Sequence, residues 1–163
     1  MCAPDTFEAM REIRVSAIVI QDGAGRVLNV RKRGTAMLML PGGKPEPGES
    51  PAATALREFS EELGVELSAA LLAPLGEFRA AAANEPDHAV IAHVFTHPFV
   101  PGARPSAEID LLEWIHPAED RTDLAPLTTE HVFPALRAHT PSADLEESST
   151  PPSTPHTNTL RSR

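Results

Sequence analysis

The chain has 163 residues, a formal charge of −9 and 41% hydrophobic residues, which together predict one globular domain with a single core. This acidic balance excludes non-specific binding of a nucleic acid polymer, which needs a basic surplus to meet the phosphates. The one cysteine, Cys2, excludes an internal disulfide framework and a four-cysteine zinc site. The sequence has no apolar run of membrane length and no signal pattern at its N-terminus, so the cytoplasm is the expected location.

Strands that lead to a glycine-rich turn are predicted in the first part of the domain. Residues 13–20 are rich in β-branched side chains and predict a strand. Beyond a turn of Gln, Asp and Gly, residues 26–31 predict its hairpin partner. A short apolar strand over residues 37–40 then delivers the chain to Gly42 and Gly43, where the missing side chains let the backbone approach a ligand closely.

A helix is predicted directly after this turn. Ser50 is a favourable N-cap, Pro51 suits the first helical position, and Gly64 can end the helix in the left-handed conformation. The predicted helix therefore runs over residues 51–63. Its apolar side chains share one face that should pack on a sheet, because 100° separates successive residues; they are Ala52, Leu56, Phe59 and Leu63.

Three carboxylates, Glu58, Glu61 and Glu62, are spaced i, i+3 and i+4 on this helix, so they should cluster on a separate face. Their repulsion destabilises a helix by roughly 0.2–0.5 kcal/mol per pair. A divalent cation such as Mg²⁺ or Mn²⁺ would offset it, because hard oxygen ligands suit these ions. Arg57 is an alternative counter-charge, and a solvated acidic face is the alternative without function.

Further strands are predicted over residues 71–78, 89–99 and 111–115, with an edge or bulge at Pro74 in the first of them. Because the strands do not alternate regularly with helices, this order predicts an α/β sandwich with a mixed sheet instead of a βαβ repeat.

The last predicted helix spans residues 129–138, with Thr128 or Thr129 as its N-cap and a kink or an early end at Pro134. The composition then changes to Ser, Thr and Pro over residues 139–163. Such a segment cannot bury a core, so a disordered tail is predicted.

The glycine-rich turn and the helix together resemble the signature of an enzyme family, the Nudix box G-x5-E-x7-R-E-U-x-E-E-x-G-U, in which U is aliphatic or aromatic. Every fixed position is filled, by Gly43, Glu49, Arg57, Glu58, Phe59, Glu61, Glu62, Gly64 and Val65. At average residue frequencies the chance of this is on the order of 10⁻⁹ per starting position. The chain thus resembles a MutT-like Nudix hydrolase over residues 11–138, between an N-terminal lead (1–10) and the tail (139–163).

The resemblance implies the Nudix α/β/α sandwich with a central mixed β-sheet. It also implies Mg²⁺-dependent hydrolysis, with Mn²⁺ as a substitute, of the pyrophosphate bond in a nucleoside diphosphate derivative such as ADP-ribose or a nucleotide sugar. The implied metal ligands are the Gly42 carbonyl, Glu58, Glu61, Glu62 and Glu108. Glu108 is assigned because MutT-type members place a glutamate six residues before a strand-end tryptophan, here Trp114, and Asp110 and Glu113 are its rivals.

The same resemblance assigns the catalytic roles. Arg57 would orient a box glutamate through an ion pair, and Glu58, Glu61, Glu62 and Glu108 complete the implied catalytic set. The general base remains open between Glu61 and Glu108, because family members differ in this residue.

Basic residues near the predicted strand ends are candidates for binding substrate phosphates. These are Arg31 and Arg33, on either side of Lys32, and Lys44 beside the glycine pair. The alternative for the run from Arg31 to Arg33 is an edge-strand charge cluster that discourages aggregation.

The substrate is not determined by the box, and two alternatives stay open. The first is a MutT-like nucleoside triphosphate pyrophosphohydrolase. The second is a catalytically silent module that senses a nucleotide, although such modules often lose box glutamates that this chain keeps. In each case the expected partner is a small nucleotide and neither a nucleic acid polymer nor a membrane. Family members commonly dimerise, so a homodimer is also left open.

Overall fold

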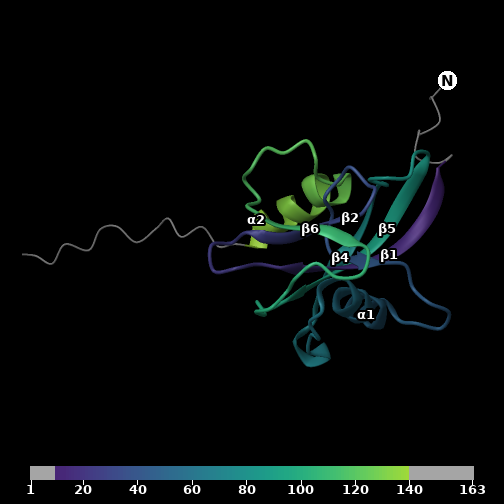
Figure 1. Cartoon of the computed structure of the whole chain (residues 1–163). Coiled ribbons are helices and arrows are strands. Elements are labelled where there is room, and N and C mark those ends of the chain that lie inside the picture. The colour runs from purple at the N-terminus through teal and green to yellow at the C-terminus, as the bar shows by residue number, and fades with distance from the viewer. Residues whose placement is uncertain (1–9, 140–163) are drawn as a thin grey trace, which may run out of the picture.

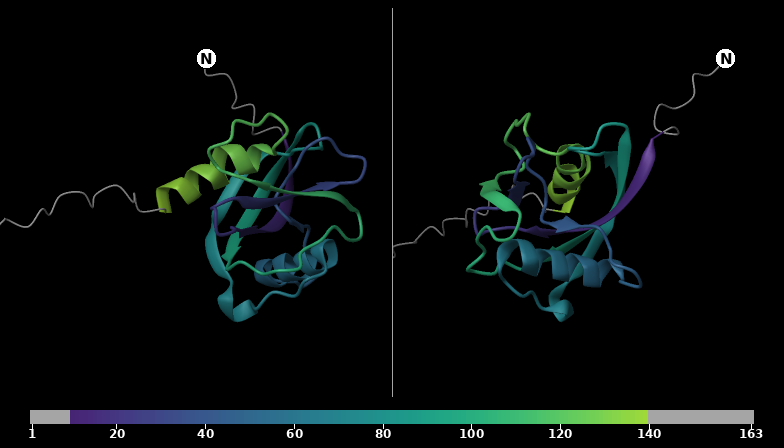
Figure 2. Two further views of the ribbon diagram at one scale, coloured as in Figure 1. Left: turned by 60° about the vertical axis from the view of Figure 1, so that its left-hand side comes forward. Right: turned by 45° about the vertical axis from the view of Figure 1, so that its right-hand side comes forward.

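The computed structural model describes residues 10–139. The predicted N-terminal lead and C-terminal tail lie outside the described residues, apart from Met10 and His139. Strands lie between two helical layers, with α1 (Pro51–Leu63) on one side and α2 (Phe133–His139) on the other (Figures 1 and 2). The predicted α/β/α sandwich is thereby confirmed. No helix in the described part combines the length and the hydropathy that a membrane crossing requires.

The central sheet has four strands in the order β3-β1-β5-β4. Their bounds are Gly42–Gly43 for β3, Arg11–Ile20 for β1, His88–His97 for β5 and Ala73–Ala81 for β4. Strands β1 and β5 run parallel, from the pair Arg11 and His88 to the pair Ile20 and His97, while the other two pairings are antiparallel. The sheet is therefore mixed, as predicted.

Strand β1 is buried on both faces, because its side chains alternate between the two cores of the sandwich. Ala17 and Val19 pack in the core that includes Val132 of the C-terminal helical segment, and Ile18 and Ile20 pack in the core beneath α1. Full burial of one such isoleucine stabilises the fold by roughly 1.5–3 kcal/mol. This strand therefore fixes both helical layers relative to the sheet.

The predicted hairpin between residues 13–20 and 26–31 is wrong. The turn itself forms, because Asp22 Oδ1 accepts hydrogen bonds from the backbone N–H groups of Ala24 and Arg26. The chain then enters a second sheet, in which β2 (Val27–Lys32) pairs antiparallel with β6 (Ile109–Ile115). Side chains on both faces of β2 are fully buried from residue 27 to residue 30, so this strand must be covered from both sides.

The bounds of α1 agree with the prediction, and its caps have the expected geometry. Ser50 Oγ accepts a hydrogen bond from the Ala53 backbone N–H at 3.2 Å, and Gly64 ends the helix with φ 69°. The buried face differs from the predicted one, because Ala52 and Leu56 are only half-buried. Its buried residues are Thr54, Ala55, Phe59, Glu62 and Leu63, so one of the three predicted acidic-face residues points into the protein.

The last helical segment begins as a π-helix, η2 (Leu127–Val132), and only then continues as α2. The predicted threonine cap is wrong: Pro126 occupies the cap position, and no side chain caps this end. The Phe133 backbone N–H donates to the Thr128 carbonyl in the wide i→i+5 pattern. Pro134 has no backbone N–H to donate, so the regular α-helical ladder is interrupted where Pro134 follows.

The remaining differences lie at the ends of predicted strands. A 3-10 turn (Ala69–Leu71) precedes β4, and the register of β4 shifts between Pro74 and Gly76, where the edge or bulge was predicted. Instead of a strand over residues 37–40, Leu38 and Met39 each form a single bridge. Because strand ends depend on partners far along the chain, local sequence places them poorly.

Candidate active site

A cavity of about 410 Å³ opens where the glycine-rich turn meets α1, η2 and the loop between β4 and β5. This volume is within the roughly 300–1,000 Å³ range of sites that enclose small ligands. Charged side chains from distant parts of the chain line it: Lys32, Lys44, Glu58, Glu85 and Glu108. The cavity therefore joins the glycine-rich turn to residues that are remote from it in sequence.

A side chain at Gly42 or at Gly43 would overlap a neighbouring group, and the neighbouring group differs between the two positions. A Cβ atom on Gly42 would overlap the carbonyl oxygen of Ser16 on β1, and the φ of Gly42 is 155°. A Cβ atom on Gly43 would lie 2.5 Å from the Glu58 carboxyl carbon. The first glycine thus permits the pairing of β3 with β1, and the second lets the Glu58 carboxylate lie against the backbone.

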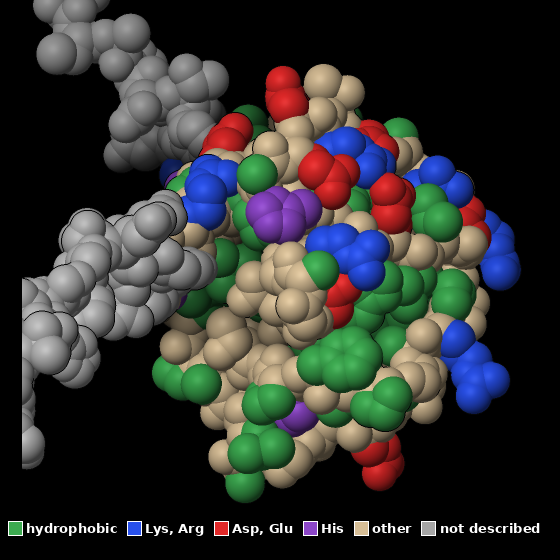
Figure 3. Space-filling view, turned by 90° about the vertical axis from the view of Figure 1, so that its left-hand side faces the viewer, with side chains coloured by type: hydrophobic (Ala, Val, Ile, Leu, Met, Phe, Trp, Pro, Cys, Tyr) green, Lys and Arg blue, Asp and Glu red, His purple; other side chains and the backbone are tan. Residues whose placement is uncertain are grey.

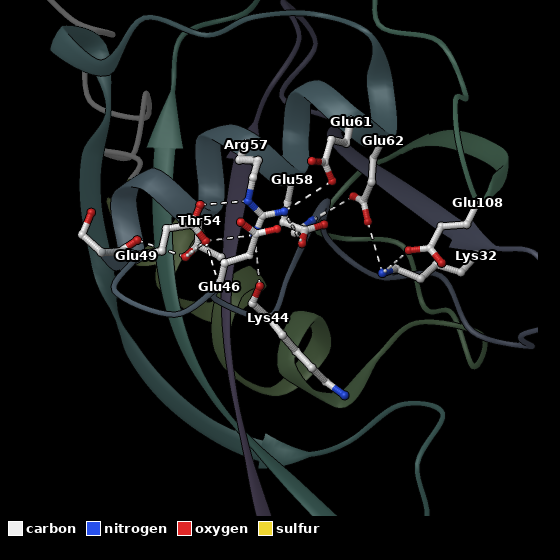
Figure 4. Close-up of polar contacts among 12 residues, drawn as sticks. Lys32, Lys44, Glu46, Glu49, Thr54, Arg57, Glu58, Glu61, Glu62 and Glu108 are labelled. Carbon is white, nitrogen blue, oxygen red and sulfur yellow. Dashed lines mark hydrogen bonds and ion pairs between the residues drawn. The ribbon is translucent and has the colours of Figure 1, made fainter.

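Arg57 connects the helix to the preceding loop through several carboxylates (Figure 4). Its Nε and Nη2 bind Glu49 Oε1 and Oε2 at 2.8 and 2.9 Å, and its Nη1 lies 2.9 Å from Glu58 Oε1 and 3.3 Å from Glu61 Oε2. The guanidinium also donates to the Lys44 carbonyl at 3.1 Å. Hydrogen bonds from Arg57 lower the pKa of Glu49 to about 2, so this carboxylate stays ionised and keeps the loop attached to the helix.

Lys32 holds the second pair of carboxylates (Figure 4). Its Nζ lies 3.3 Å from Glu62 Oε1 and 3.0 Å from Glu108 Oε1. Burial acts to lower the pKa of Lys32, but attraction to Glu62 and the hydrogen bond to Glu108 outweigh it and raise the pKa. The antiparallel register of β2 and β6, which pairs Lys32 with Ile109, creates this contact.

Glu62 is the buried carboxylate of the site, with 2% of its surface exposed. Burial raises its pKa to about 7, although Lys32 and a 3.0 Å hydrogen bond from the Gly42 N–H to Oε2 both favour the charged form. Its Oε1 has the ion pair with Lys32 but accepts no hydrogen bond from any residue that the structure describes. A buried carboxylate oxygen whose one charged neighbour is an ammonium group at 3.3 Å is suited to a further cationic ligand.

Some of the side chains predicted for the site lie at the cavity, and others lie on the surface away from it. Glu58, Glu62 and Glu108 lie with Gly42 at the cavity or directly behind it, whereas Glu61 is more exposed and pairs with Arg57. Among the basic candidates, Lys44 lines the cavity and lies 3.6 Å from Glu85. Arg31 pairs with Asp110 at 3.1 Å, and neither Arg31 nor Arg33 lines the cavity.

Lys32 was not among the residues predicted to bind substrate. Side chains alternate between the two faces of a strand, so the sequence predicts that Arg31 and Lys32 lie on opposite faces. Selecting the inward-facing one requires knowing that β2 pairs with β6, which sequence alone did not indicate.

The donor set fits a divalent cation. Five carboxylates (Glu49, Glu58, Glu61, Glu62 and Glu108) surround only two cations, Arg57 and Lys32, and the glycine backbone lies beside them. Carboxylate and carbonyl oxygens are the ligands that Mg²⁺ and Mn²⁺ prefer. Within residues 10–139, no three acidic, histidine or cysteine side chains already lie close enough together to hold a metal ion. Arg57 and Lys32 form ion pairs with the carboxylates in this structure.

The raised pKa of Glu62 predicts a pH-dependent stability of the metal-free protein. Between the unfolded value of 4.5 and the folded value of about 7, the native state retains a proton that the unfolded chain releases, so the free energy of unfolding falls as pH rises. The full effect is about 3 kcal/mol at most. In EDTA, Glu62→Gln should therefore gain stability relative to wild type between pH 4.5 and 7 in urea unfolding.

The control is Glu66→Gln, the same change at an exposed position just beyond the helix. Its stability should follow that of wild type across this pH range. Parallel pH profiles for wild type and Glu62→Gln would contradict the assignment of the raised pKa to Glu62.

Comparison with known proteins agrees with this geometry. The model of the NUDIX domain family matches residues 10–136. Among solved structures, the E. coli ORF135 protein is 27% identical with a TM-score of 0.62, over 83% of this chain and 97% of that chain. No curated protein matches the sequence significantly.

Two more distant structures share the fold. A MutT protein from Methanosarcina mazei Go1 is 21% identical with a TM-score of 0.63, over 79% of this chain and 93% of that chain. A bifunctional NMN adenylyltransferase/ADP ribose pyrophosphatase from Francisella tularensis, complexed with AMP and a Mn ion, is 18% identical with a TM-score of 0.61, over 83% of this chain and 43% of that chain. Because the family model covers most of the sequence, the chain belongs to the Nudix family, hydrolases that act on acid anhydrides in phosphorus-containing compounds.

Proposed function

We propose that this enzyme hydrolyses the pyrophosphate bond of a nucleoside diphosphate derivative, of the ADP-ribose or nucleotide-sugar type, with Mg²⁺ as cofactor and Mn²⁺ as a substitute. The observation that carries the proposal is the complete Nudix box folded against a cavity of nucleotide size. The AMP and Mn ion bound to the F. tularensis enzyme, which is named an ADP ribose pyrophosphatase, support both the substrate class and the metal class.

The residues that would hold the cation are the Gly42 carbonyl and the carboxylates of Glu58, Glu61, Glu62 and Glu108. When bound, such a cation neutralises charge on the pyrophosphate oxygens and makes a water molecule more nucleophilic. Arg57 acts as a positioning residue, because it fixes Glu58 and the loop that carries Glu49. The glycine pair lets the substrate phosphates approach the backbone.

Lysine side chains supply the positive charge for the phosphates. Lys32 and Lys44 line the cavity, so they are better placed for this role than Arg31, which is paired with Asp110. Lys32 also positions Glu62 and Glu108, since its Nζ lies 3.3 Å from Glu62 Oε1 and 3.0 Å from Glu108 Oε1.

The proton of the attacking water would go to Glu61 or Glu108. Their side chains are 56% and 61% exposed, whereas those of Glu58 and Glu62 are 15% and 2% exposed. A general base must reach a water molecule, and exposure favours the first two residues for this role. The pH–rate profiles of Glu61→Gln and Glu108→Gln would identify which of the two residues is the general base.

A nucleoside triphosphate is the second candidate substrate. The fold shared with the M. mazei MutT protein, over 79% of this chain and 93% of that chain, keeps this alternative alongside the first. Both candidates share the attack on a phosphorus atom of a pyrophosphate bond, so the site residues keep the same roles in either case.

A small nucleotide is the proposed partner, in preference to a nucleic acid polymer. The net charge of −9 supports this choice. On the face shown in Figure 3, basic and acidic side chains are intermixed in the upper half, and hydrophobic side chains gather in the lower half. No continuous basic surface crosses that face within the described residues.

The cytoplasm is the proposed location, supported by the single cysteine of the chain.

Turnover on a substrate panel tests this proposal. The panel contains ADP-ribose, nucleotide sugars, dinucleoside polyphosphates and the canonical nucleoside triphosphates, each with Mg²⁺, with Mn²⁺ and with EDTA. We expect a diphosphate-linked compound to exceed every triphosphate in kcat/KM by about tenfold or more, which corresponds to roughly 1.4 kcal/mol of transition-state binding. EDTA should abolish turnover.

Each other outcome has a defined meaning. A preference for one triphosphate selects the MutT-like alternative. Saturable nucleotide binding without turnover on any compound contradicts an enzymatic role and favours the sensor.

A further inference from the structure

The turn that carries Glu108 has an unusual backbone conformation. Within residues 10–139, only two residues other than glycine have a positive φ, and one of them is Ala107, with φ 52°. The Ile109 N–H donates to the Ser106 carbonyl at 3.0 Å, so Ala107 and Glu108 are the two central residues of a tight turn. A positive φ at the first central residue alone is typical of type II′ turns, which favour glycine there. The chain thus has alanine at a position that suits glycine.

Packing of the Ala107 methyl group does not account for this conformation, because the residue is exposed. An alanine at positive φ destabilises the backbone relative to glycine, since its Cβ atom comes close to neighbouring backbone atoms. Such residues persist where the surrounding contacts determine the conformation, and they are concentrated at active sites. The contacts of the backbone around Ala107 therefore hold the turn in this form.

Backbone hydrogen bonds attach the turn to two different elements of the site. On one side of Ala107, the Ser106 N–H donates to the Glu62 carbonyl at 2.9 Å, at the C-terminal end of α1. On the other side, the Arg33 N–H just beyond β2 donates to the Glu108 carbonyl at 2.7 Å. Ala107 lies between these two attachments. Its backbone conformation therefore determines how the backbone of Glu108 is placed relative to α1.

The Glu108 carboxylate depends on this backbone for its position. Figure 4 shows Glu62 and Glu108 pointing toward Lys32, whose Nζ lies 3.3 Å from Glu62 Oε1 and 3.0 Å from Glu108 Oε1. The register of β2 and β6 shifts at Lys32, which pairs with Ile109 directly after the turn, and such bulges re-aim side chains beside active sites. The Glu108 side chain is 61% exposed, so the fold does not enclose it. Its place in the site is therefore set mainly by the turn.

We propose that Ala107 is a positioning residue for the reaction, an inference that rests on the proposed function. Its restricted backbone holds the Glu108 carboxylate near Glu62, so that both carboxylates can bind the same cation. Glycine at this position would relieve the unfavourable φ, but it would also let the turn sample other conformations. A small displacement of a catalytic group lowers the rate strongly. The stability that alanine loses here is thus offset by a better ordered site.

The test is Ala107→Gly, which should raise stability and weaken the site. Its melting temperature in EDTA should rise by about 2 °C or more, because glycine adopts this φ without strain. Its affinity for Mn²⁺ alone, measured by calorimetry without substrate, should fall by about fivefold, and kcat at saturating Mg²⁺ should fall by about tenfold with little change in KM. A residue with only a structural role would not raise stability and lower metal affinity together.

Two further variants show whether Ala107 acts through Glu108. Asp87→Gly is the matched control, because Asp87 is the other non-glycine residue with a positive φ in the described part of the chain, and it does not line the cavity. This variant should keep the Mn²⁺ affinity and kcat of wild type. Glu108→Gln, alone and combined with Ala107→Gly, completes a double-mutant cycle. The combined variant should bind Mn²⁺ as weakly as Glu108→Gln alone, because the turn then has no carboxylate to position.

The outcomes separate this inference from the proposed function. Wild-type Mn²⁺ affinity in Ala107→Gly or in Glu108→Gln, losses that add in the combined variant, or a lowered melting temperature of Ala107→Gly overturns the inference. Turnover of the substrate panel by wild type would leave the proposed function intact in each of these cases. Conversely, non-additive losses of Mn²⁺ affinity in a protein without turnover on the panel would remove the hydrolase proposal and retain Ala107 as the residue that positions Glu108.

Discussion

Glu62→Gln should lower kcat by about 10²-fold or more while the fold stays intact. The substitution preserves shape and an oxygen that can accept the Gly42 N–H hydrogen bond, but it removes the negative charge of the most buried carboxylate at the site. Loss of one preorganised electrostatic contact commonly costs about 10²–10³-fold in kcat. The apolar face of α1 is unchanged, so circular dichroism should match that of wild type, and the melting temperature of the metal-free protein should equal or exceed that of wild type because burial disfavours the charged form of Glu62.

The measurement is kcat and KM for the best substrate of the panel across a Mg²⁺ titration. If Glu62 holds the cation, the Mg²⁺ concentration needed for half-maximal activity should also rise. Glu66→Gln provides the matched control, since it makes the same change at an exposed position. Wild-type kcat in Glu62→Gln would remove Glu62 from the site and with it the assignment of the buried carboxylate to the metal.

Substitution of the two adjacent glycines by alanine should affect different properties, the stability of the fold at Gly42 and the turnover at Gly43. Gly42→Ala places its Cβ against the rigid Ser16 carbonyl at a φ of 155°, so we expect a loss of about 2–4 kcal/mol in the free energy of unfolding and a melting temperature lower by roughly 10 °C. Gly43→Ala places its Cβ 2.5 Å from the Glu58 carboxyl carbon. A side-chain end can move away, so stability should change little, while kcat should fall by about tenfold or more because Glu58 is displaced.

Gly23→Ala is the control for both, because nothing lies within 4 Å of a Cβ atom at that position. Chemical unfolding and kinetics on all three variants give the comparison. A stable Gly42→Ala protein would contradict the close approach of β3 to β1. Full activity in Gly43→Ala would show that the position of the Glu58 carboxylate against the backbone has no part in catalysis.

Much of the site follows from local sequence. The Nudix box fixed the spacing of Glu58, Glu61 and Glu62, and the caps Ser50 and Gly64 bounded α1 correctly because capping involves residues within one turn. The fold class also followed, since the order of strands and helices allows few layered arrangements. The burial of Glu62 could not be predicted from the sequence, because helical periodicity gives the faces of a helix but not which face lies against the sheet.

The tertiary structure alone decided the rest. Pairing of β2 with β6 brings Lys32 to Glu108 across 76 residues of sequence, and no local signal selects that partner over a hairpin. The π-helical start of the last helical segment and the β4–β5 loop bring Thr128 and Asn84 to one cavity in the same way. The sequence by itself thus determined the family, the helix and the carboxylate spacing, which depend on contacts within a few residues. The charge partners of those carboxylates and the walls of the cavity depend on long-range strand pairing and burial, which only the folded chain supplies.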